Sequence, residues 1–241
     1  MREVSKSASE FVVVFRVPSA PFFAKGTSLS LRIVYEGEEI RATFRTRHID
    51  VGIAEPLLGH LWIDARGHAN GIEDAVSRFG GAVDSIVPLI AFCSNAAIAD
   101  MEPELAFNNT LNLSKREFFQ QFVPQERPLI HAGRKIDVPI VEAFVGALEG
   151  HPEKDRIARA ISHYRLALRH WRWGHEVMAT AHLYIGMETL TKCVVRTRYD
   201  GLSEAETAFR LGIDPTKLGP CQRLHSEIEA AVRRQILFQG D

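Results

Sequence analysis

The period of the hydrophobic residues changes along this chain, and the change limits the folds that the chain can adopt. Up to about residue 70, apolar and polar side chains alternate, which is typical of strands that bury one face. From about residue 140 onward, apolar side chains recur every three or four residues, which is typical of amphipathic helices. We therefore expect an α+β fold, with a β-rich N-terminal domain followed by an all-helical C-terminal domain.

Residues 1–139 are predicted to form the mixed, β-rich domain. Phe11–Val17 is rich in β-branched and aromatic residues, and we expect it to be a strand that ends at Pro18. Ser28–Tyr35 and Ile40–Arg47 alternate on either side of a short turn that contains glycine. This pattern predicts a β-hairpin.

One long helix is expected within this domain, near residues 70–99. Asn70 is positioned to cap the N-terminus of the helix. Gly80-Gly81 and Pro88 are expected to bend or break it, because glycine and proline weaken the helical hydrogen-bond ladder.

Residues 140–241 are predicted to form the helical domain, which follows an irregular connection at 112–139 with a short helical turn at Lys115–Phe122. The expected helices are Ile140–Leu148, Arg156–Trp173, His175–Arg198, Ser203–Leu211 and Gln222–Phe238. Gly174 leaves only a tight turn between the second and third helices, which we expect to pack as an antiparallel pair. The third helix is apolar on nearly every face, which is typical of a buried central helix.

Composition excludes several classes of protein. The chain has 29 Lys and Arg against 30 Asp and Glu, which argues against a polybasic nucleic-acid binder and against an acidic disordered chain. Its three cysteines form no CxxC pair, so neither a disulfide framework nor a cysteine zinc site is expected. No signal peptide and no apolar run of about 20 residues is seen, which predicts a cytoplasmic protein without a membrane segment.

The common catalytic motifs are absent from the chain. It contains no P-loop, no GxGxxG, no HExxH and no GxSxG sequence. We therefore expect no cofactor and no metal ion. One enzymatic hypothesis is a hydrolase with a site in the first half, where His48, Asp50, His60, Asp64 and His68 lie close together in the sequence.

Arginine and histidine residues are concentrated in the second half. Arg165, Arg169 and Arg172 share one side of their helix, where they are expected either to bind phosphate groups or simply to face solvent. Four histidines accompany them: His163, His170, His175 and His182. The first two are seven residues apart, too far to bind one metal ion without other elements, so they are interpreted as histidines at the edge of the core.

Glu188 is the one acidic residue in the middle of the most apolar helix. An ionised carboxylate there needs a partner, so Glu188 is expected to form a structural ion pair or to be an active-site acid with a raised pKa. Arg233 and Arg234 of the last helix are the candidate partners, and Arg234 is preferred. A buried or half-buried ion pair between Glu188 and one of these arginines is therefore predicted.

Two segments resemble HEPN-type helical domains. Residues 156–198, with the core AHLYIGMETL at Ala181–Leu190, resemble the first long helices of those domains. The C-terminal run RQILFQGD at Arg234–Asp241 resembles the end of their last helix, which carries an Arg-x4–6-His motif. The arrangement is most similar to the family described as methylamine utilisation protein J, related to the Apea-like HEPN group. Gln239 stands where the family motif has histidine.

The resemblance implies a homodimer formed through the helical domain. In HEPN ribonucleases, arginine and histidine side chains of two protomers meet at the dimer cleft. An amide cannot exchange a proton near pH 7, so Gln239 argues against RNA cleavage. The favoured hypothesis is a non-catalytic HEPN-like protein that binds a partner protein, a nucleotide or RNA, with a family link to amine utilisation.

The alternative is a metal-independent endoribonuclease with a degenerate motif, in which the catalytic candidates are Arg234, Gln239 and Glu188. The residues expected to contact a ligand are Arg165, Arg169, Arg172, Arg233 and Arg234. The resemblance leaves open whether the natural chain extends beyond Asp241.

Overall fold

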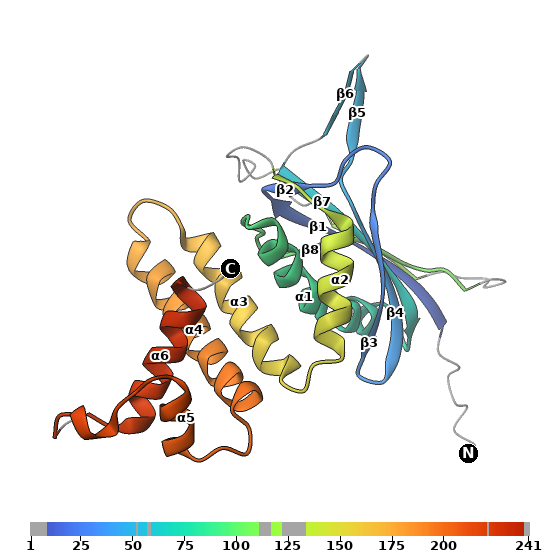
Figure 1. Cartoon of the computed structure of the whole chain (residues 1–241). Coiled ribbons are helices and arrows are strands. Elements are labelled where there is room, and N and C mark those ends of the chain that lie inside the picture. Colours follow the sequence, from blue (N-terminus) through green and yellow to red (C-terminus); the bar gives the residue numbers. More distant parts are fainter. Residues whose placement is uncertain are drawn as a thin grey trace, which may run out of the picture. The chain divides into compact units, whose positions relative to one another are not determined.

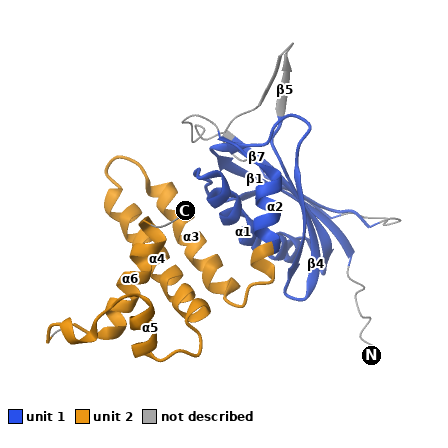
Figure 2. Ribbon diagram, viewed as in Figure 1, with its two compact units in different colours: residues 1–146 blue, residues 147–241 orange. Residues whose placement is uncertain are grey.

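The computed structural model describes residues 9–51, 53–56, 59–110, 117–121, 134–220 and 222–238. The chain divides into two compact units, residues 1–146 and residues 147–241 (Figure 2). The division falls within helix α2 (Val138–Glu149). An antiparallel sheet dominates the first half and helices follow it, which confirms the mixed α/β composition and its order along the chain.

A six-stranded sheet forms the centre of the first unit, with strand order β3-β4-β7-β1-β8-β9 (Figure 1). These strands are β1 (Ser9–Ser19), β3 (Leu29–Tyr35), β4 (Glu38–Arg45), β7 (Gly59–Ala69), β8 (Glu102–Asn108) and β9 (Phe118–Gln120). The two longest strands, β1 and β7, pair along their whole length, from Ser9 opposite Ala69 to Ser19 opposite Gly59.

Four shorter strands complete the described β structure. β2 (Pro21–Phe22) pairs in parallel with β10 (Arg134–Lys135), and β5 (His48–Val51) pairs with β6 (Ile53–Pro56).

The predicted hairpin is confirmed as β3 and β4. Its two connecting residues, Glu36 and Gly37, both have positive φ angles, of 51° and 84°. Two consecutive left-handed residues give a turn whose twist matches that of the paired strands. The register places Tyr35 opposite Glu38 and Leu29 opposite Phe44.

Helix α1 (Ile72–Ser94) packs on one face of the sheet (Figure 1). It is one continuous helix, so of the predicted bend or break at Gly80-Gly81 and Pro88 the break was wrong. At Gly81 the missing side chain serves packing, because a Cβ there would lie 2.5 Å from the hydroxyl oxygen of Tyr35. Close contact between helix and sheet therefore explains this glycine.

The start of α1 also differs from the prediction. Gly71, rather than Asn70, occupies the N-cap position, and no side chain caps it in the usual way. The carboxylate of Glu117 accepts a hydrogen bond from the Ile72 amide at 3.0 Å. A residue 45 positions further along the chain thus satisfies a free N–H of the first turn, and a local sequence pattern cannot reveal such a partner.

Two further local predictions were wrong. Strand β1 continues past Pro18 to Ser19, and the Pro18 carbonyl still accepts a hydrogen bond from the Ala99 amide at 2.8 Å. The expected helical turn at Lys115–Phe122 contains strand β9 instead, which pairs with the edge of β8. The first two residues and the last residue of that predicted turn lie outside the described residues.

Within the described residues, α1 is the one helix long and apolar enough to cross a membrane by length and composition. Half of its apolar stretch is buried inside the unit. Phe79, Val83 and Ile90 are among its fully buried side chains. This burial is what a core helix of a soluble protein shows.

The second unit is helical. Its α-helices are α3 (Lys154–His170), α4 (Glu176–Arg198), α5 (Glu204–Arg210) and α6 (Leu224–Phe238). Gly186 of α4 lies near Ala160 of α3, while His175 stacks on His170, so the two helices are antiparallel, as predicted, and Gly174 between them has a φ of 83°. The capping box of Ser203 and Glu206 at α5 is present.

Helix α4 is not buried all round, contrary to the prediction. Its buried residues are few and mostly small: Ala179, Gly186, Thr191 and Cys193. Several large apolar side chains face solvent, among them Val177 at 82% exposure and Tyr184 at 57%. The apolar composition of α4 therefore reflects an exposed hydrophobic surface on this chain and not burial on all sides.

Candidate functional site

Helices α3 and α4 approach each other closely at Gly186. A Cβ on this residue would lie 3.1 Å from the carbonyl oxygen of Ala160 and 3.5 Å from the Cβ of His163. Without a side chain at position 186, the two backbones come near enough for histidines on the facing sides to touch.

A ladder of four imidazole rings runs along this helix pair. The Nδ1 atoms of His163 and His182 lie 3.2 Å apart. The His182 ring stacks on His170 with 5.7 Å between centroids, and the His170 ring stacks on His175 at 5.8 Å. The four rings thus come alternately from α3 and from the α4 side of the helical hairpin, and all are half-buried. We call them the histidine ladder.

The spacing in the sequence explains the ladder. His163 and His170 are seven residues apart, and so are His175 and His182. Residues at that spacing lie on one face of a helix, two turns apart. Because the helices are antiparallel about Gly174, each ring of one pair fills the gap left by the other. The second seven-residue interval was the signal for this arrangement, and the prediction of separate histidines at the edge of the core missed it.

The middle rings of the ladder favour the neutral state. The pKa of His170 lies below its usual value, mainly because of desolvation, with added effects from the charges of His182, His175, Arg169 and Arg172. The pKa of His182 is also lowered, by desolvation first and by His163 second. Two uncharged imidazoles near neutral pH can accept or donate hydrogen bonds without repelling the arginines around them.

The contact between His163 and His182 fixes their protonation further. Two protonated rings would both be donors at Nδ1, and their contact would be repulsive. One ring must therefore donate through Nδ1–H while the other accepts at Nδ1, and the tautomers of the two rings decide which does which. The arrangement therefore requires at least one neutral ring.

The tip of the helical hairpin carries exposed aromatic and cationic groups. Trp171 is 69% exposed and Trp173 is 96% exposed, and Arg172 between them is also exposed. These three residues line a hollow of about 360 Å³ together with Glu176 and Thr180 of α4. A tryptophan with almost all of its surface in water is costly for a folded chain, and such residues are common at binding surfaces.

The acidic group at this tip is held by the backbone. Glu176 accepts a hydrogen bond from the Gly174 amide at 3.0 Å. Backbone amide hydrogen bonds, of Glu176 itself and of Gly174, lower the pKa of Glu176. The carboxylate therefore fixes the turn, and the guanidinium of Arg172 remains exposed beside it.

The predicted arginine face is not uniform. Arg165 is 6% exposed and belongs to the interior of the unit, whereas Arg169 is half-buried and Arg172 is exposed. Only the last two are accessible to a ligand. Burial of Arg165 was not visible in the sequence, because its position on the helix wheel is next to residues that do face solvent.

The other predicted arginines lie on α6, which contacts α4. The guanidinium of Arg233 lies over the Tyr184 ring, 5.4 Å from its centroid. Arg234 is exposed. Helix α4 thus contacts α3 at Gly186 and α6 at Tyr184. Gln239, the third motif position, lies outside the described residues.

The predicted buried or half-buried ion pair of Glu188 with Arg233 or Arg234 was wrong. The carboxylate of Glu188 is 38% exposed and pairs with Lys192, one turn further along α4, at 2.8 Å. The hydrogen bond from Lys192 is the main cause of its lowered pKa, and the charge of Arg233 adds a smaller effect. Glu188 is therefore a half-exposed carboxylate with a local partner and not an acid with a raised pKa.

The histidines and aspartates of the first half do not form one cluster. His60, Asp64 and His68 lie on β7 at intervals of four residues, about 13 Å apart in an extended strand. Asp64 pairs with Arg45 on the neighbouring strand at 2.9 Å. The side chains of His48 and Asp50 lie outside the described residues. Among described side chains, no three His, Cys, Asp or Glu residues are placed to hold a metal ion.

Comparisons with protein-family models, curated proteins and solved structures find no significant match. The resemblance to HEPN-type domains therefore stays a prediction from the sequence. What the geometry itself offers is a row of stacked imidazoles that leads to a tip with two tryptophans and an accessible arginine. These groups can stack on planar rings and bind phosphate oxygens.

Proposed function

We propose that the helical unit is a HEPN-like domain that binds single-stranded RNA at the tip of the α3–α4 hairpin without cleaving it. The observation that carries this proposal is the exposure of Trp171 and Trp173 on either side of Arg172. Aromatic rings stack on unpaired bases, while a guanidinium binds the phosphates between them.

The charge around the tip suits a polyanion. Arg169 and Arg172 act as positive charges on His170, the third ring of the ladder. Binding of phosphate near these groups would favour protonation of the rings, since an anion offsets the repulsion that lowers the pKa of His170. RNA binding is therefore expected to strengthen as the pH falls and as the salt concentration falls.

Cleavage is not favoured as the main function. General acid–base cleavage needs imidazole nitrogens that reach the substrate. In this structure His163 and His182 are directed at each other, and the Nδ1 atom of His170 is buried. Gln239, where the resembling family has histidine, cannot move a proton near pH 7.

Self-association through the helical unit is part of the proposal. Helix α4 exposes Val177 and Met178 in its first turn and Ile185 further along. Such side chains on one helix are typical of surfaces that meet a second copy or another protein. Light scattering of the purified chain is expected to give the mass of a homodimer, and Val177→Asp should shift it towards the monomer.

The test is fluorescence anisotropy with a labelled single-stranded RNA of mixed sequence. Trp173→Ala and Arg172→Ala are each expected to weaken binding by about tenfold, as for the loss of one stacked base or one phosphate contact. Phe209→Ala and Arg210→Ala are matched controls, because both residues are exposed on α5 of the same unit. Equal affinities for all four variants and the unaltered protein would overturn the proposal.

A second candidate is a metal-independent ribonuclease, favoured by the contact between His163 and His182. Acid–base cleavage of RNA requires a proton acceptor and a proton donor close together, and two adjacent imidazoles can fill these roles. Incubation with a labelled RNA in EDTA tests this function. Cleavage that is lost in His182→Gln and retained in Arg234→Ala would place activity at the ladder, and loss in both would place it at the family motif.

A further inference from the structure

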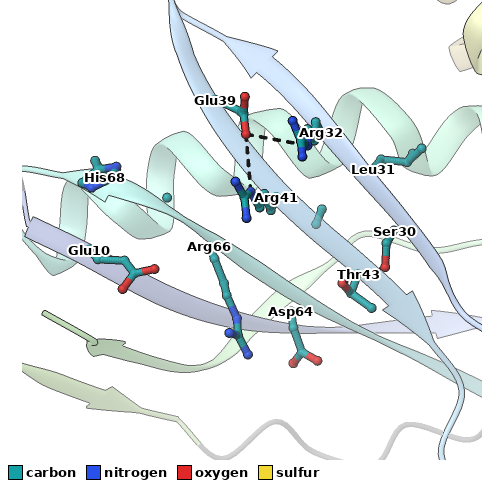
Figure 3. Close-up of a pocket in the computed structure, with 12 residues that line it drawn as sticks. Glu10, Ser30, Leu31, Arg32, Glu39, Arg41, Thr43, Asp64, Arg66 and His68 are labelled. Carbon is teal, nitrogen blue, oxygen red and sulfur yellow. Dashed lines mark hydrogen bonds and ion pairs between the residues drawn. The ribbon is translucent and has the colours of Figure 1, made fainter. Parts of the chain in front are cut away.

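The sheet of the first unit has a second face, away from α1, and this face is hollowed. The side chains of β4 show the alternation: Ile40, Ala42 and Phe44 are buried, while Arg41 is exposed on the opposite side. A hollow of about 650 Å³ lies on that side, over β3, β4, β7 and the start of β1 (Figure 3). This volume falls within the range of small-molecule sites.

Three arginines cross the floor of the hollow in one row. Arg32 of β3 lies opposite Arg41 of β4, and Arg41 lies opposite Arg66 of β7. Directly opposed side chains of the same charge destabilise a sheet. A row of three such residues is therefore unfavourable for the free protein unless an anion lies among them. We call these residues the arginine row.

The chain itself supplies only part of the negative charge that the arginine row needs. One carboxylate oxygen of Glu39 lies 3.4 Å from Nε of Arg41 and 4.0 Å from Nε of Arg32, so one acid serves two arginines (Figure 3). Among the described residues, none forms a side-chain hydrogen bond or an ion pair with Arg66. Its neighbour on the same strand, Asp64, is already paired with Arg45. The exposed guanidinium of Arg66 thus keeps its donors for a ligand.

The groups beside the arginine row are mostly polar. One register step along the strands, the hydroxyls of Ser30 and Thr43 lie 3.1 Å apart and face the same hollow. On the other side of the row lie Glu10 and His68, which are paired across β1 and β7. No phenylalanine, tyrosine or tryptophan from the described residues lines the hollow, so His68 is the one ring there on which a base could stack.

We propose that the hollow is a binding site for a small sugar phosphate. Arg66 and Arg41 hold the phosphate, since the planar fork of a guanidinium matches two phosphate oxygens. Ser30 and Thr43 hydrogen-bond the hydroxyls of the sugar. The site uses residues of the first unit alone, so it stands or falls independently of RNA binding at the α3–α4 tip.

The experiment is calorimetric titration of the full-length chain with ribose 5-phosphate. Heat of binding is expected at micromolar to millimolar concentrations, with Arg66→Gln weakening the affinity by tenfold or more, as for the loss of a charge-assisted hydrogen bond. Arg134→Gln is the matched control, because Arg134 is exposed on β10 of the same unit and does not line the hollow. The control should bind as the unaltered protein does.

Thermal unfolding separates binding from folding. Without ligand, Arg66→Gln should melt at the same temperature as the unaltered protein or slightly higher, because the substitution removes a like-charge neighbour of Arg41. With ribose 5-phosphate, the unaltered protein should gain stability while the variant should not. A variant that melts much lower without ligand would show a structural role for Arg66 and would overturn the proposal.

Two further titrations define the ligand. Ribose should not bind, and inorganic phosphate should bind more weakly than ribose 5-phosphate, because Ser30 and Thr43 then have no partner. Equal affinity for inorganic phosphate and the sugar phosphate would overturn the assignment of the hydroxyls. Absence of binding by ribose 5-phosphate, with loss of RNA affinity in Arg66→Gln, would overturn the proposal in favour of a nucleic-acid surface.

Discussion

The carbonyl oxygen of Ala160 on α3 lies 3.1 Å from the point where a Cβ on Gly186 of α4 would be. This distance is shorter than ordinary carbon–oxygen contacts, and the neighbour is backbone, which cannot turn aside. Gly186→Ala gains about 1 kcal/mol of helix propensity and loses about 1–3 kcal/mol through overpacking, so a net destabilisation of about 1 kcal/mol is expected. Thermal unfolding measures it.

Gly146 provides the matched control for this substitution. It lies inside α2, and a Cβ there would meet no atom within 4 Å. Gly146→Ala should therefore stabilise the chain by about 0.5–1 kcal/mol through helix propensity alone. Stabilisation by both substitutions would show that α3 and α4 are not in close contact at Gly186.

The stability of the helical unit should fall in mildly acidic solution. The folded-state pKa values of His170 and His182 are lowered, while in the unfolded chain both return to about 6.5. Below that pH the unfolded chain binds more protons than the folded chain, so stability is full above about pH 7 and is lost as the pH falls through 6.5. Melting temperatures measured between about pH 5.5 and pH 8 test this, because that range spans the pKa of about 6.5 for free imidazole.

Variants of the ladder separate this effect from other titrations. His182→Gln should flatten the dependence, because an amide has no proton to gain in this range. His68→Gln, on the sheet of the first unit, should leave the dependence unchanged. The carboxylates with lowered pKa, such as Glu206 and Asp214, lose their stabilising effect only below about pH 4.5 and do not interfere.

Glu188→Gln should be a mild substitution. The pair with Lys192 is a solvent-accessible contact between residues four apart on one helix, and such pairs contribute about 0.3–0.5 kcal/mol. A buried pair with Arg234 would have made the loss about 3–5 kcal/mol. Urea unfolding distinguishes the two values, and a large loss would restore the buried pair.

Ser203→Ala should remove a helix cap. The Ser203 hydroxyl accepts a hydrogen bond from the Glu206 amide at 3.3 Å, while the Glu206 carboxylate accepts one from the Ser203 amide at 2.9 Å. Loss of such a cap costs about 1 kcal/mol of unfolding free energy. Ser226→Ala, at an exposed site on α6, is the control and should change stability by less than about 0.5 kcal/mol.

Local patterns predicted the parts of the fold that depend on local interactions. The β3–β4 hairpin was readable because alternation and the Glu36-Gly37 turn both act within a few residues. The α3–α4 pair was readable because Gly174 leaves no room for any other connection. The cap of α1 by Glu117 and the pairing of β9 were not readable, because both join segments distant in the sequence.

The candidate site was predicted less well, for a related reason. Periodicity shows that a residue shares a face with others, but it does not show whether that face meets protein or water. Arg165 was thus predicted to be accessible although it is buried, and Glu188 was predicted to be buried although it is half-exposed. The histidine ladder was missed because each helix shows only half of it, and the order of the rings appears only when the two helices are set against each other.

The positions of the three tryptophans make the protein its own optical probe. Trp62 is 3% exposed, beneath the guanidinium of Arg47 at 4.5 Å, so its surroundings stay nearly dry. Trp171 and Trp173 are both in water at the hairpin tip. Exposed indoles emit at longer wavelength than buried ones, so emission collected at the red side of the band comes mainly from the tip, and a bromide or acrylamide quencher reaches the same two rings first. Binding of a ligand at the tip can be followed in unlabelled protein, because the ligand reduces the quenching of these two tryptophans.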